Sequence, residues 1–351
     1  MAGKARNDPT PATADRKDAH LALAADPLAR SGVSAGFELV TLEHCALPEC
    51  DLKAVDISTT CLGRMVSAPL FVGSMTGGTA HADAINAALA RTAEATGLPL
   101  AVGSQRASLE SGRSQAELRQ MAPSVPLIGN LGGVQLAAPG GLDLARRAID
   151  DLAADAIFIH LNPLQEAAQP EGETGWRGVI DAIESLVGVV EVPVMAKEVG
   201  AGIGPDVARR LFDVGVHAVD VAGLGGTNWT RIEVARREDA EMFEPFLDWG
   251  IPTVTALRAV RAACPGGRII GSGGITNGLE AAKALWLGAS LVSMAGPVLR
   301  ALTGDGRGKP DAEAATKVIE RWKSQLQLTL FLTGAENLDA FAAVPGQVSG
   351  R

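Results

Sequence analysis

The sequence predicts an α/β protein built around a closed eight-stranded (β/α)8 barrel, the TIM-barrel architecture. Eight short apolar runs recur along the chain, and the segments between them have the periodicity of amphipathic helices. Small residues follow nearly every run, at the strand ends where such barrels bind ligands. The 351 residues are 47% hydrophobic, which is enough for one barrel core, so we expect a single domain.

The expected elements follow one another in a regular order. The strands are residues 70–72, 100–102, 126–128, 157–159, 192–195, 218–221, 268–270 and 291–293, which are apolar as buried parallel strands are. The helices are residues 81–96, 142–154, 178–187, 205–214, 252–263 and 277–288, followed by a C-terminal helix over 312–332. Weak alternation over 37–58 predicts a hairpin that covers one end of the barrel.

The two ends of the chain lack this alternation of strands and helices. Residues 1–14 have no periodicity, and we expect a mobile N-terminal tail there. Residues 341–351 are expected to form a C-terminal tail, so the barrel domain spans 15–340. It begins with an N-terminal extension in which Arg16 and His20 fall on one helix face. Such a cluster is more often a solvated helix start than an anion site.

Composition argues against several classes of function. The formal net charge of −9 disfavours a nucleic-acid-binding surface, so any anion site must be a local basic pocket. No apolar run is long enough to span a bilayer and no secretory signal is present, so we expect a cytoplasmic protein without a membrane partner. Cys45, Cys50, Cys61 and Cys264 form no C-x-x-C pair, which argues against a zinc site. Because tyrosine is absent, proton transfer must use His, a carboxylate, Lys or a cofactor.

The most informative stretch is 160–173, which begins where the fourth expected strand ends. We expect an extended loop, restricted by two prolines at 163 and 170, that holds His160, Asn162, Gln165 and Glu166 in one orientation. Amide and carboxylate oxygens suit a hard cation such as Mg²⁺, which a diphosphate substrate would bring with it. The alternative is a solvated strand end without function. It is the weaker interpretation, because no aliphatic spacing would bury this stretch.

The loops after the last two expected strands indicate a phosphate site. They carry Gly273-Gly274 and Ala295-Gly296 and each precedes a helix, which is where barrels bind phosphate on backbone N–H groups. Small residues at the other strand ends suggest that something flat lies across the mouth of the barrel. A flat ring with a phosphate tail suggests flavin mononucleotide (FMN), and a phosphosugar is the alternative.

Two further residues have two interpretations each. Lys197 ends the fifth expected strand, where a lysine either forms a Schiff base or places a fixed positive charge beside a cofactor. Trp229 either stacks on a ligand or packs under a lid.

Together these motifs resemble the type 2, FMN-dependent isopentenyl diphosphate isomerases over residues 15–335. The resemblance is carried by Arg16-Lys17 with His20, Met75-Thr76-Gly77-Gly78, Ser104-Gln105-Arg106, the stretch 160–172, Lys197-Glu198-Val199-Gly200 and Gly225-Gly226-Thr227. Their order and their placement at successive strand ends are more specific than any glycine pair. The chain departs from the family pattern at Ala222, where a Ser or Thr hydroxyl often contacts the flavin, and at Gly204.

The resemblance implies a role for each motif. The flavin ring would lie on Met75, Thr76 and Gly77, its edges would meet Ser104, Asn130, Lys197 and Thr227, and its phosphate would lie at Gly271, Ser272, Gly273, Ala295 and Gly296. The substrate would be bound by Arg16, Lys17, His20, Ser104, Gln105, Arg106, His160, Asn162, Gln165 and Trp229. Gln165, His160 and Lys197 would be the catalytic residues, and Glu166 would hold Mg²⁺ with Asn162 and Glu233.

The implied reaction converts isopentenyl diphosphate to dimethylallyl diphosphate with reduced FMN and Mg²⁺, a step of isoprenoid biosynthesis. NADPH or NADH would reduce the flavin, and the family suggests a homotetramer or homo-octamer. One rival function is that of an FMN-dependent 2-hydroxy-acid oxidase or dehydrogenase. Such enzymes carry His-Gly-x-Arg after the sixth strand, where this chain has Gly223-Leu224-Gly225-Gly226. Two more rivals are a Schiff-base aldolase that uses Lys197 and a flavin-binding paralogue without turnover.

Overall fold

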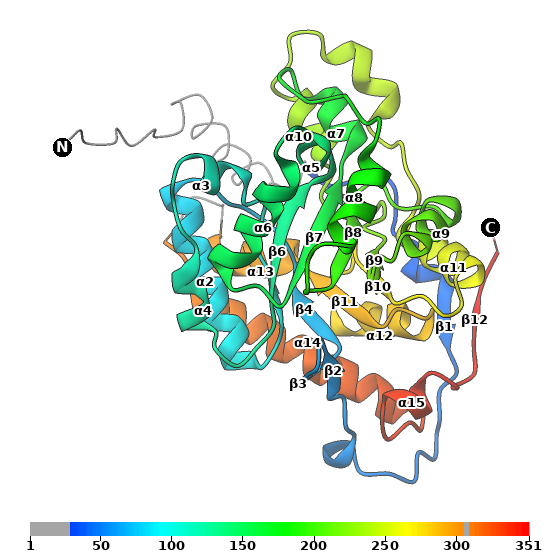
Figure 1. Ribbon diagram of the computed structural model, residues 1–351. Helices are drawn as coiled ribbons and strands as arrows, with labels where there is room; N and C mark the ends of the chain where they lie inside the picture. Colours follow the sequence, from blue (N-terminus) through cyan, green and yellow to red (C-terminus); the bar gives the residue numbers. More distant parts are fainter. Residues whose placement is uncertain (1–28, 305–308, 351) are drawn as a thin grey trace.

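Within residues 29–304 and 309–350, which the computed structural model describes, eight parallel strands close into a barrel (Figure 1). This confirms the predicted fold class. The strand order around the barrel follows the chain, and β11 pairs with β4 to close the ring. The strands are β4 (Leu70–Val72), β5 (Leu100–Ala101), β6 (Leu127–Gly132), β7 (Ala156–Leu161), β8 (Val194–Glu198), β9 (Ala218–Asp220), β10 (Ile269–Gly271) and β11 (Leu291–Met294).

The barrel strands are buried on both faces, which is why their sequences do not alternate. Phe71 and Phe158 point into the barrel, where their ring centroids lie 6.2 Å apart. Successive side chains point to opposite faces of a strand, so the neighbours Leu70 and Val72 belong instead to the layer between strands and helices. All four side chains are fully buried. The two apolar layers hold the strand ends in fixed positions.

Amphipathic helices cover the outside of the barrel (Figure 1). The helices that the sequence predicts are found within two residues of their expected bounds, and the C-terminal helix has the expected bounds. Side-chain caps fix several starts, as where Thr79 accepts a 3.0 Å hydrogen bond from the Ala82 N–H. These helices are α2 (Ala80–Thr96), α6 (Gly141–Leu152), α8 (Val179–Val187), α9 (Pro205–Asp213), α11 (Thr253–Ala263), α12 (Gly278–Trp286) and α14 (Ala312–Leu332).

The sequence did not predict several short helices, and one of them corrects the expectation of an extended loop at 160–173. His160 belongs to β7, and α7 (Pro163–Ala168) begins two residues after that strand. Pro163 occupies the first helical position, where its fixed φ favours a helix start. The other unpredicted helices are α3 (Arg106–Glu110), α4 (Ala116–Met121), α5 (Gly133–Ala137), α10 (Trp229–Val234), α13 (Gly296–Thr303), α15 (Leu338–Phe341) and the 3₁₀ turns η2 (Phe37–Leu39), η3 (Leu52–Ala54) and η4 (Ala240–Phe246).

Two expectations about the outer segments are wrong. The hairpin lies after the expected 37–58 region, where β2 (Thr59–Cys61) pairs with β3 (Arg64–Val66) around a turn at Leu62 and Gly63 with positive φ. Within 37–58, β1 (Val40–Leu42) pairs instead with β12 (Gly346–Val348). The segment 341–351 is therefore not a simple tail. In Figure 1 the red C-terminal strand runs beside the blue β1. The expected tail 1–14 lies outside the described residues.

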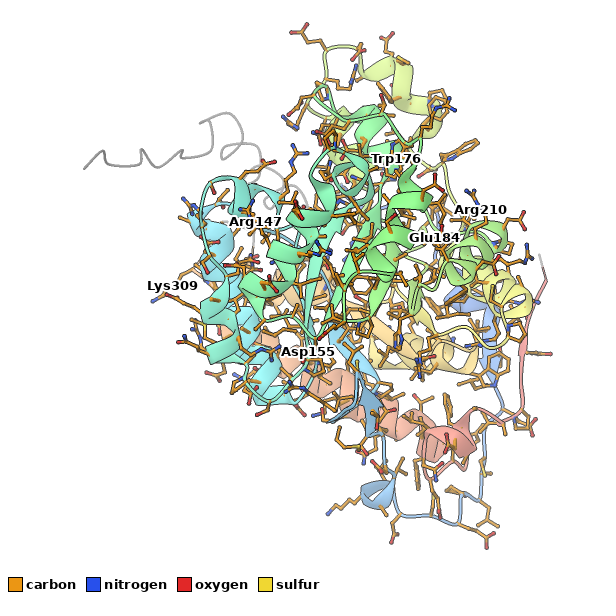
Figure 2. The ribbon with its side chains drawn as sticks, viewed as in Figure 1. Arg147, Asp155, Trp176, Glu184, Arg210 and Lys309 are labelled. Carbon is orange, nitrogen blue, oxygen red and sulfur yellow. The ribbon has the colours of Figure 1, made fainter. Side chains whose placement is uncertain are left out.

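Ion pairs secure the barrel at the end where the strands begin. Asp155, the residue before β7 that Figure 2 labels, accepts hydrogen bonds from Arg64 at 3.0 Å and from Arg119 at 2.6 Å. It also accepts the Leu127 N–H at 2.8 Å, which ties the starts of β6 and β7 together. In the described ranges, no helix is both long enough and apolar enough to cross a membrane.

We predict that deleting residues 346–351 lowers the free energy of unfolding by about 1–3 kcal/mol, because the edge of β1 loses its hydrogen-bonded partner. Urea denaturation followed by circular dichroism measures the change. An unchanged unfolding midpoint would show that the pairing of β1 with β12 adds nothing to stability.

Candidate active site

A cavity of about 610 Å³ opens where the barrel strands end, a size typical of small-molecule sites. It brings together most of the residues that the sequence analysis singled out. They come from loops far apart in the chain, and closure of the barrel makes them neighbours. The predicted residues that line it are Met75, Thr76, Gly77, Ser104, Arg106, Asn130, His160, Asn162, Gln165, Glu166, Lys197, Thr227, Trp229, Ser272, Gly273, Ala295 and Gly296.

Three predicted site residues do not line this cavity: Gln105, Gly271 and Glu233. The Glu233 carboxylate is fully buried and binds Gln165 and Arg236, so it is not placed to hold a cation with Glu166. Gln105 is fully buried: its Oε1 accepts the Asn130 N–H and its Nε2 donates to the Ala148 carbonyl, both at 3.0 Å. Gln105 therefore supports Asn130 from behind and does not face a substrate. Gly271 is the last residue of β10, and a Cβ atom there would face the helix layer at Ala284 and Ala289. Arg16, Lys17 and His20 lie outside the described residues.

A hydrogen-bonded chain fixes the tautomer of His160. Asn130 Nδ2 donates to Ser74 Oγ at 2.9 Å, so its Oδ1 faces His160 Nδ1 at 2.8 Å and accepts that proton. The Nε2 atom is left with a free lone pair. Burial lowers the pKa of His160 to about 3, with further lowering by the positive charges of Lys197 and Arg106. The imidazole is therefore neutral at physiological pH.

A second chain fixes the amide of Gln165 between α7 and α10. Asn162 Nδ2 donates to Gln165 Oε1 at 3.1 Å, and Gln165 Nε2 donates to Glu233 Oε1 at 3.1 Å. Glu233 is fully buried and is paired with Arg236 at 2.9 Å. Both ends of the Gln165 amide thus have a defined partner, and its orientation in the cavity wall is set before any ligand arrives.

The carboxylate of Glu166 is also engaged at both oxygens. Oε1 accepts from Asn162 Nδ2 at 3.0 Å and Oε2 accepts the Glu173 N–H at 2.7 Å. In the part of the chain that the structure describes, no cluster of three or more His, Cys, Asp or Glu side chains is placed to hold a metal. A divalent cation at Glu166 would therefore need further oxygen ligands from amide side chains, water or a bound substrate.

Lys197 is held at the end of β8 by its neighbour. The Glu198 Oε2 atom accepts hydrogen bonds from the N–H groups of residues 199–202, at 2.5 to 3.2 Å, and this fixes the turn that follows the strand. Lys197 Nζ donates to the Glu198 carbonyl and lines the cavity. Its Cα partner on β9 is Asp220.

Asp220 is a candidate functional residue that the sequence analysis missed. It is fully buried and lines the cavity. Its Oδ1 accepts from Ser272 Oγ at 2.5 Å, whereas Oδ2 has no hydrogen-bond partner among the described residues. Burial raises the pKa of Asp220, and Lys197 opposes that rise. The signal in the sequence was a lone acid inside an apolar run. The Ser272 hydroxyl is therefore directed to this acid.

Close backbone contacts shape the mouth of the cavity. A Cβ atom on Gly103 would lie 2.3 Å from the Thr76 carbonyl oxygen, and one on Gly273 would lie 2.0 Å from the Gly223 carbonyl oxygen. Gly273 also has a φ of +96°, which disfavours other residues. Around residues 76 and 273 the backbone itself therefore forms the cavity wall, which leaves room for a broad ligand.

Two arginines that the sequence analysis did not single out lie at the Gly296 end of the cavity. Arg30 and Arg300 both line it, and among the described residues neither forms an ion pair or hydrogen bond through its guanidinium. Burial lowers the pKa of Arg300, and the charge of Arg30 lowers it further. A Cβ atom on Gly296 would lie 3.1 Å from Arg300 Nη1, so the guanidinium reaches the start of α13. Two unpaired positive charges beside a helix start favour an anion.

The comparisons with known proteins agree with this geometry. Residues 164–344 match the family of FMN-dependent dehydrogenases. An isopentenyl-diphosphate delta-isomerase from Stutzerimonas stutzeri (strain A1501) is 48% identical over 330 residues, covering 92% of this chain and 94% of that protein. The chain belongs to the isopentenyl-diphosphate delta-isomerase family. Further members are those of Xanthobacter autotrophicus, at 47% identity over 94% of this chain and 96% of that protein, and Synechocystis, at 42% over 95% of each.

Solved structures share the fold of this family member at lower identity. A mandelate oxidase variant with benzaldehyde has a TM-score of 0.67 and 21% identity, covering 95% of this chain and 94% of that one. A mandelate oxidase with (S)-4-hydroxymandelic acid has a TM-score of 0.65 and 20% identity, over 95% and 99%. At this identity the likeness concerns the barrel alone.

The cavity fits the FMN that the family profile implies. Met75, Thr76 and Gly77 line the cavity together with Lys197, whose cation would suit the negative charge of a reduced flavin. After β11, Arg300 and the start of α13 offer donors for a phosphate.

We predict that Arg300→Gln weakens FMN binding about tenfold or more, because it removes a charged hydrogen-bond donor to the phosphate. Riboflavin, which has no phosphate, should bind the variant and the unaltered protein equally. Fluorescence titration of the flavin-free protein with each flavin measures both affinities, and Arg258→Gln on the exposed face of α11 is the control. An equal loss for both flavins would place the phosphate elsewhere.

We also predict a pH dependence of stability from His160. Below about pH 6.5, His160 is protonated in the unfolded chain but stays neutral in the folded protein until about pH 3. The free energy of unfolding therefore falls as the pH falls through this window. Between about pH 7.5 and about pH 5, the free energy of unfolding of His160→Gln should therefore fall by up to about 2 kcal/mol less than that of the unaltered protein. Urea unfolding at both pH values measures this, and parallel losses would contradict it.

Proposed function

We propose that this chain converts isopentenyl diphosphate to dimethylallyl diphosphate, the activity for which its relatives are named. The observation that carries the proposal is the Gln165 amide, which lines the cavity and is held in one orientation by Asn162 and Glu233. The reaction moves a double bond by adding one proton and removing another. It therefore requires an alkene held in a fixed pose and sheltered from water.

The diphosphate would bind at the basic side of the cavity. Arg106 and Lys197 supply positive charge there, and the neutral His160 lies beside them. A bound diphosphate adds negative charge and opposes the effect of the two cations, so it raises the pKa of His160 and favours a donating imidazolium. By the family motif, the proposed site also includes Arg16, Lys17 and His20.

Gln165 would orient the alkene. An amide does not titrate near neutral pH, so Gln165 cannot carry the proton that the reaction moves. Its Oε1 accepts from Asn162 and its Nε2 donates to the buried Glu233 carboxylate, so the amide meets the cavity with its faces. Trp229, at the start of α10, lines the same region and would exclude water from it.

The proposed cofactors are reduced FMN, Mg²⁺, and NADPH or NADH as reductant. Reduced FMN, when bound, supplies an electron-rich ring that can exchange protons. Lys197 would hold its negative charge, and Ser104, Asn130 and Thr227 would contact its edges. Glu166 would hold Mg²⁺ together with diphosphate oxygens, since this cation prefers oxygen ligands.

A 2-hydroxy-acid oxidase is not supported. Those enzymes need a base and a carboxylate-binding arginine after the sixth barrel strand, but the cavity wall there consists of Ala222, Gly225 and Gly226. Ala222 has a backbone φ of +37°, which is rare for residues other than glycine.

We further propose a cytoplasmic homo-oligomer, a homotetramer or homo-octamer. Supporting this, Met242, Phe246 and Trp249 are 66%, 40% and 63% exposed and lie close together in sequence between α10 and α11. Apolar side chains gathered in this way are typical of a surface that another chain covers.

The decisive experiment is an anaerobic isomerisation assay of the purified flavoprotein with and without NADPH or NADH. We expect turnover only when the flavin is reduced. Gln165→Ala should lower kcat about a hundredfold or more while the visible flavin spectrum is retained, because orientation of the alkene is lost. Glu184→Gln on the exposed face of α8 is the control (Figure 2). Full activity of Gln165→Ala, or a colourless protein that FMN does not reconstitute, would refute the proposal.

A further inference from the structure

Arg106, the cavity arginine at the start of α3, is already engaged by carboxylates of this chain. Its Nη1 donates to Glu173 Oε2 at 3.0 Å, and its Nε faces Glu110 Oε1 at 3.5 Å. The same Glu173 oxygen accepts a hydrogen bond from Gln135 Nε2. One oxygen thus receives a guanidinium N–H and an amide N–H, both from residues that line the cavity.

Glu173 therefore occupies the position in which Arg106 would meet a phosphate oxygen. A phosphate oxygen accepts the same two kinds of donor with similar geometry. The backbone N–H of Glu173 is bound separately, to Glu166 Oε2 at 2.7 Å. The segment around 173 can thus stay anchored at Glu166 while its side chain leaves Arg106.

We propose that Glu173 is a built-in competitor for the diphosphate of the substrate. Its carboxylate holds Arg106 and Gln135 in the free protein, and the incoming diphosphate displaces it. The inference rests on the proposed function in that it takes a diphosphate as the ligand of Arg106.

The burial of the ion pair suits such an exchange. The side chains of Arg106 and Glu173 are 36% and 45% exposed, so both are hydrated and the carboxylate can turn into water when it is released. Exposed ion pairs add little to stability, so a diphosphate with several charges can replace this one. A fully buried carboxylate would block the site permanently.

The competitor would also limit how tightly the site retains its product. The diphosphate is the same in substrate and product and lies away from the double bond, so its binding energy is equal for both and does not lower the reaction barrier. Too much of it would slow product release. A carboxylate that returns to Arg106 weakens both complexes and favours release.

The test is isothermal titration of the FMN-loaded protein with inorganic pyrophosphate. Glu173→Gln should bind pyrophosphate about three- to tenfold more tightly than the unaltered protein, because the competing charge is lost. Glu110→Gln is the matched control: it removes the same charge beside the same arginine, but at a longer contact and from a more exposed side chain. We expect less than about a twofold change there.

The variant Glu173→Asp distinguishes the effect of the contact with Arg106 from the effect of the negative charge. It keeps the negative charge but shortens the side chain by one methylene, so it should still tighten pyrophosphate binding, by less than Glu173→Gln. The flavin spectrum and the melting temperature verify that each variant is folded. Unchanged or weaker binding in Glu173→Gln would overturn the inference, and would make Glu173 a residue that positions Arg106. An equal gain in Glu110→Gln would overturn it as well.

The outcome is independent of the isomerase assay. Failure of isomerisation with tighter pyrophosphate binding in Glu173→Gln would refute the proposed function alone. Normal isomerisation with unchanged pyrophosphate binding would refute the competitor alone.

Discussion

The closed ring of parallel hydrogen bonds is the constraint on which the site depends. The pairing of β11 with β4, where Ser293 lies opposite Phe71, joins the last barrel strand to the first. In a closed parallel barrel every strand ends at the same rim, so loops from residue 73 to residue 300 must meet there. Breaking that one pairing would separate the Gly296 end of the cavity from the Met75 wall.

Within the cavity, side chains are oriented by one another more than by the backbone. His160 depends on Asn130, which is held from behind by Gln105, and Gln165 depends on Asn162 and Glu233. Such chains limit rotation before a ligand arrives, which reduces the entropy lost on binding. Glu198 likewise limits the motion of the turn after β8, because its carboxylate accepts several backbone N–H groups.

The fold could be predicted from the sequence because burial on both faces leaves a clear pattern. The residues 70–72 form a strand at the predicted bounds, since this short apolar run is bounded by Pro69 and Gly73 and is buried on both faces. The hairpin at 59–66 was missed because its turn uses Leu62 with positive φ, and a leucine gives no signal for that conformation. The pairing of β1 with β12 joins segments about 300 residues apart, which local periodicity cannot reveal.

The sequence predicted which residues line the candidate site better than it predicted how their side chains are oriented. Gln105 was grouped with Ser104 and Arg106, but its side chain points back into the structure toward Ala148. Arg30 and Arg300 were missed because each is an isolated arginine in sequence, and only the closed barrel brings them to one end of the cavity.

The placement of Trp229 has a spectroscopic consequence. The chain has five tryptophans and no tyrosine, so its ultraviolet emission comes from indole alone. Trp229 lines the cavity, whereas Trp322 is buried on the inner face of α14 and Trp286 donates its indole N–H to the Val344 carbonyl. Flavins absorb light at the wavelengths that indole emits. Energy transfer from Trp229 therefore gives the protein an intrinsic optical reporter of whether its cavity is filled.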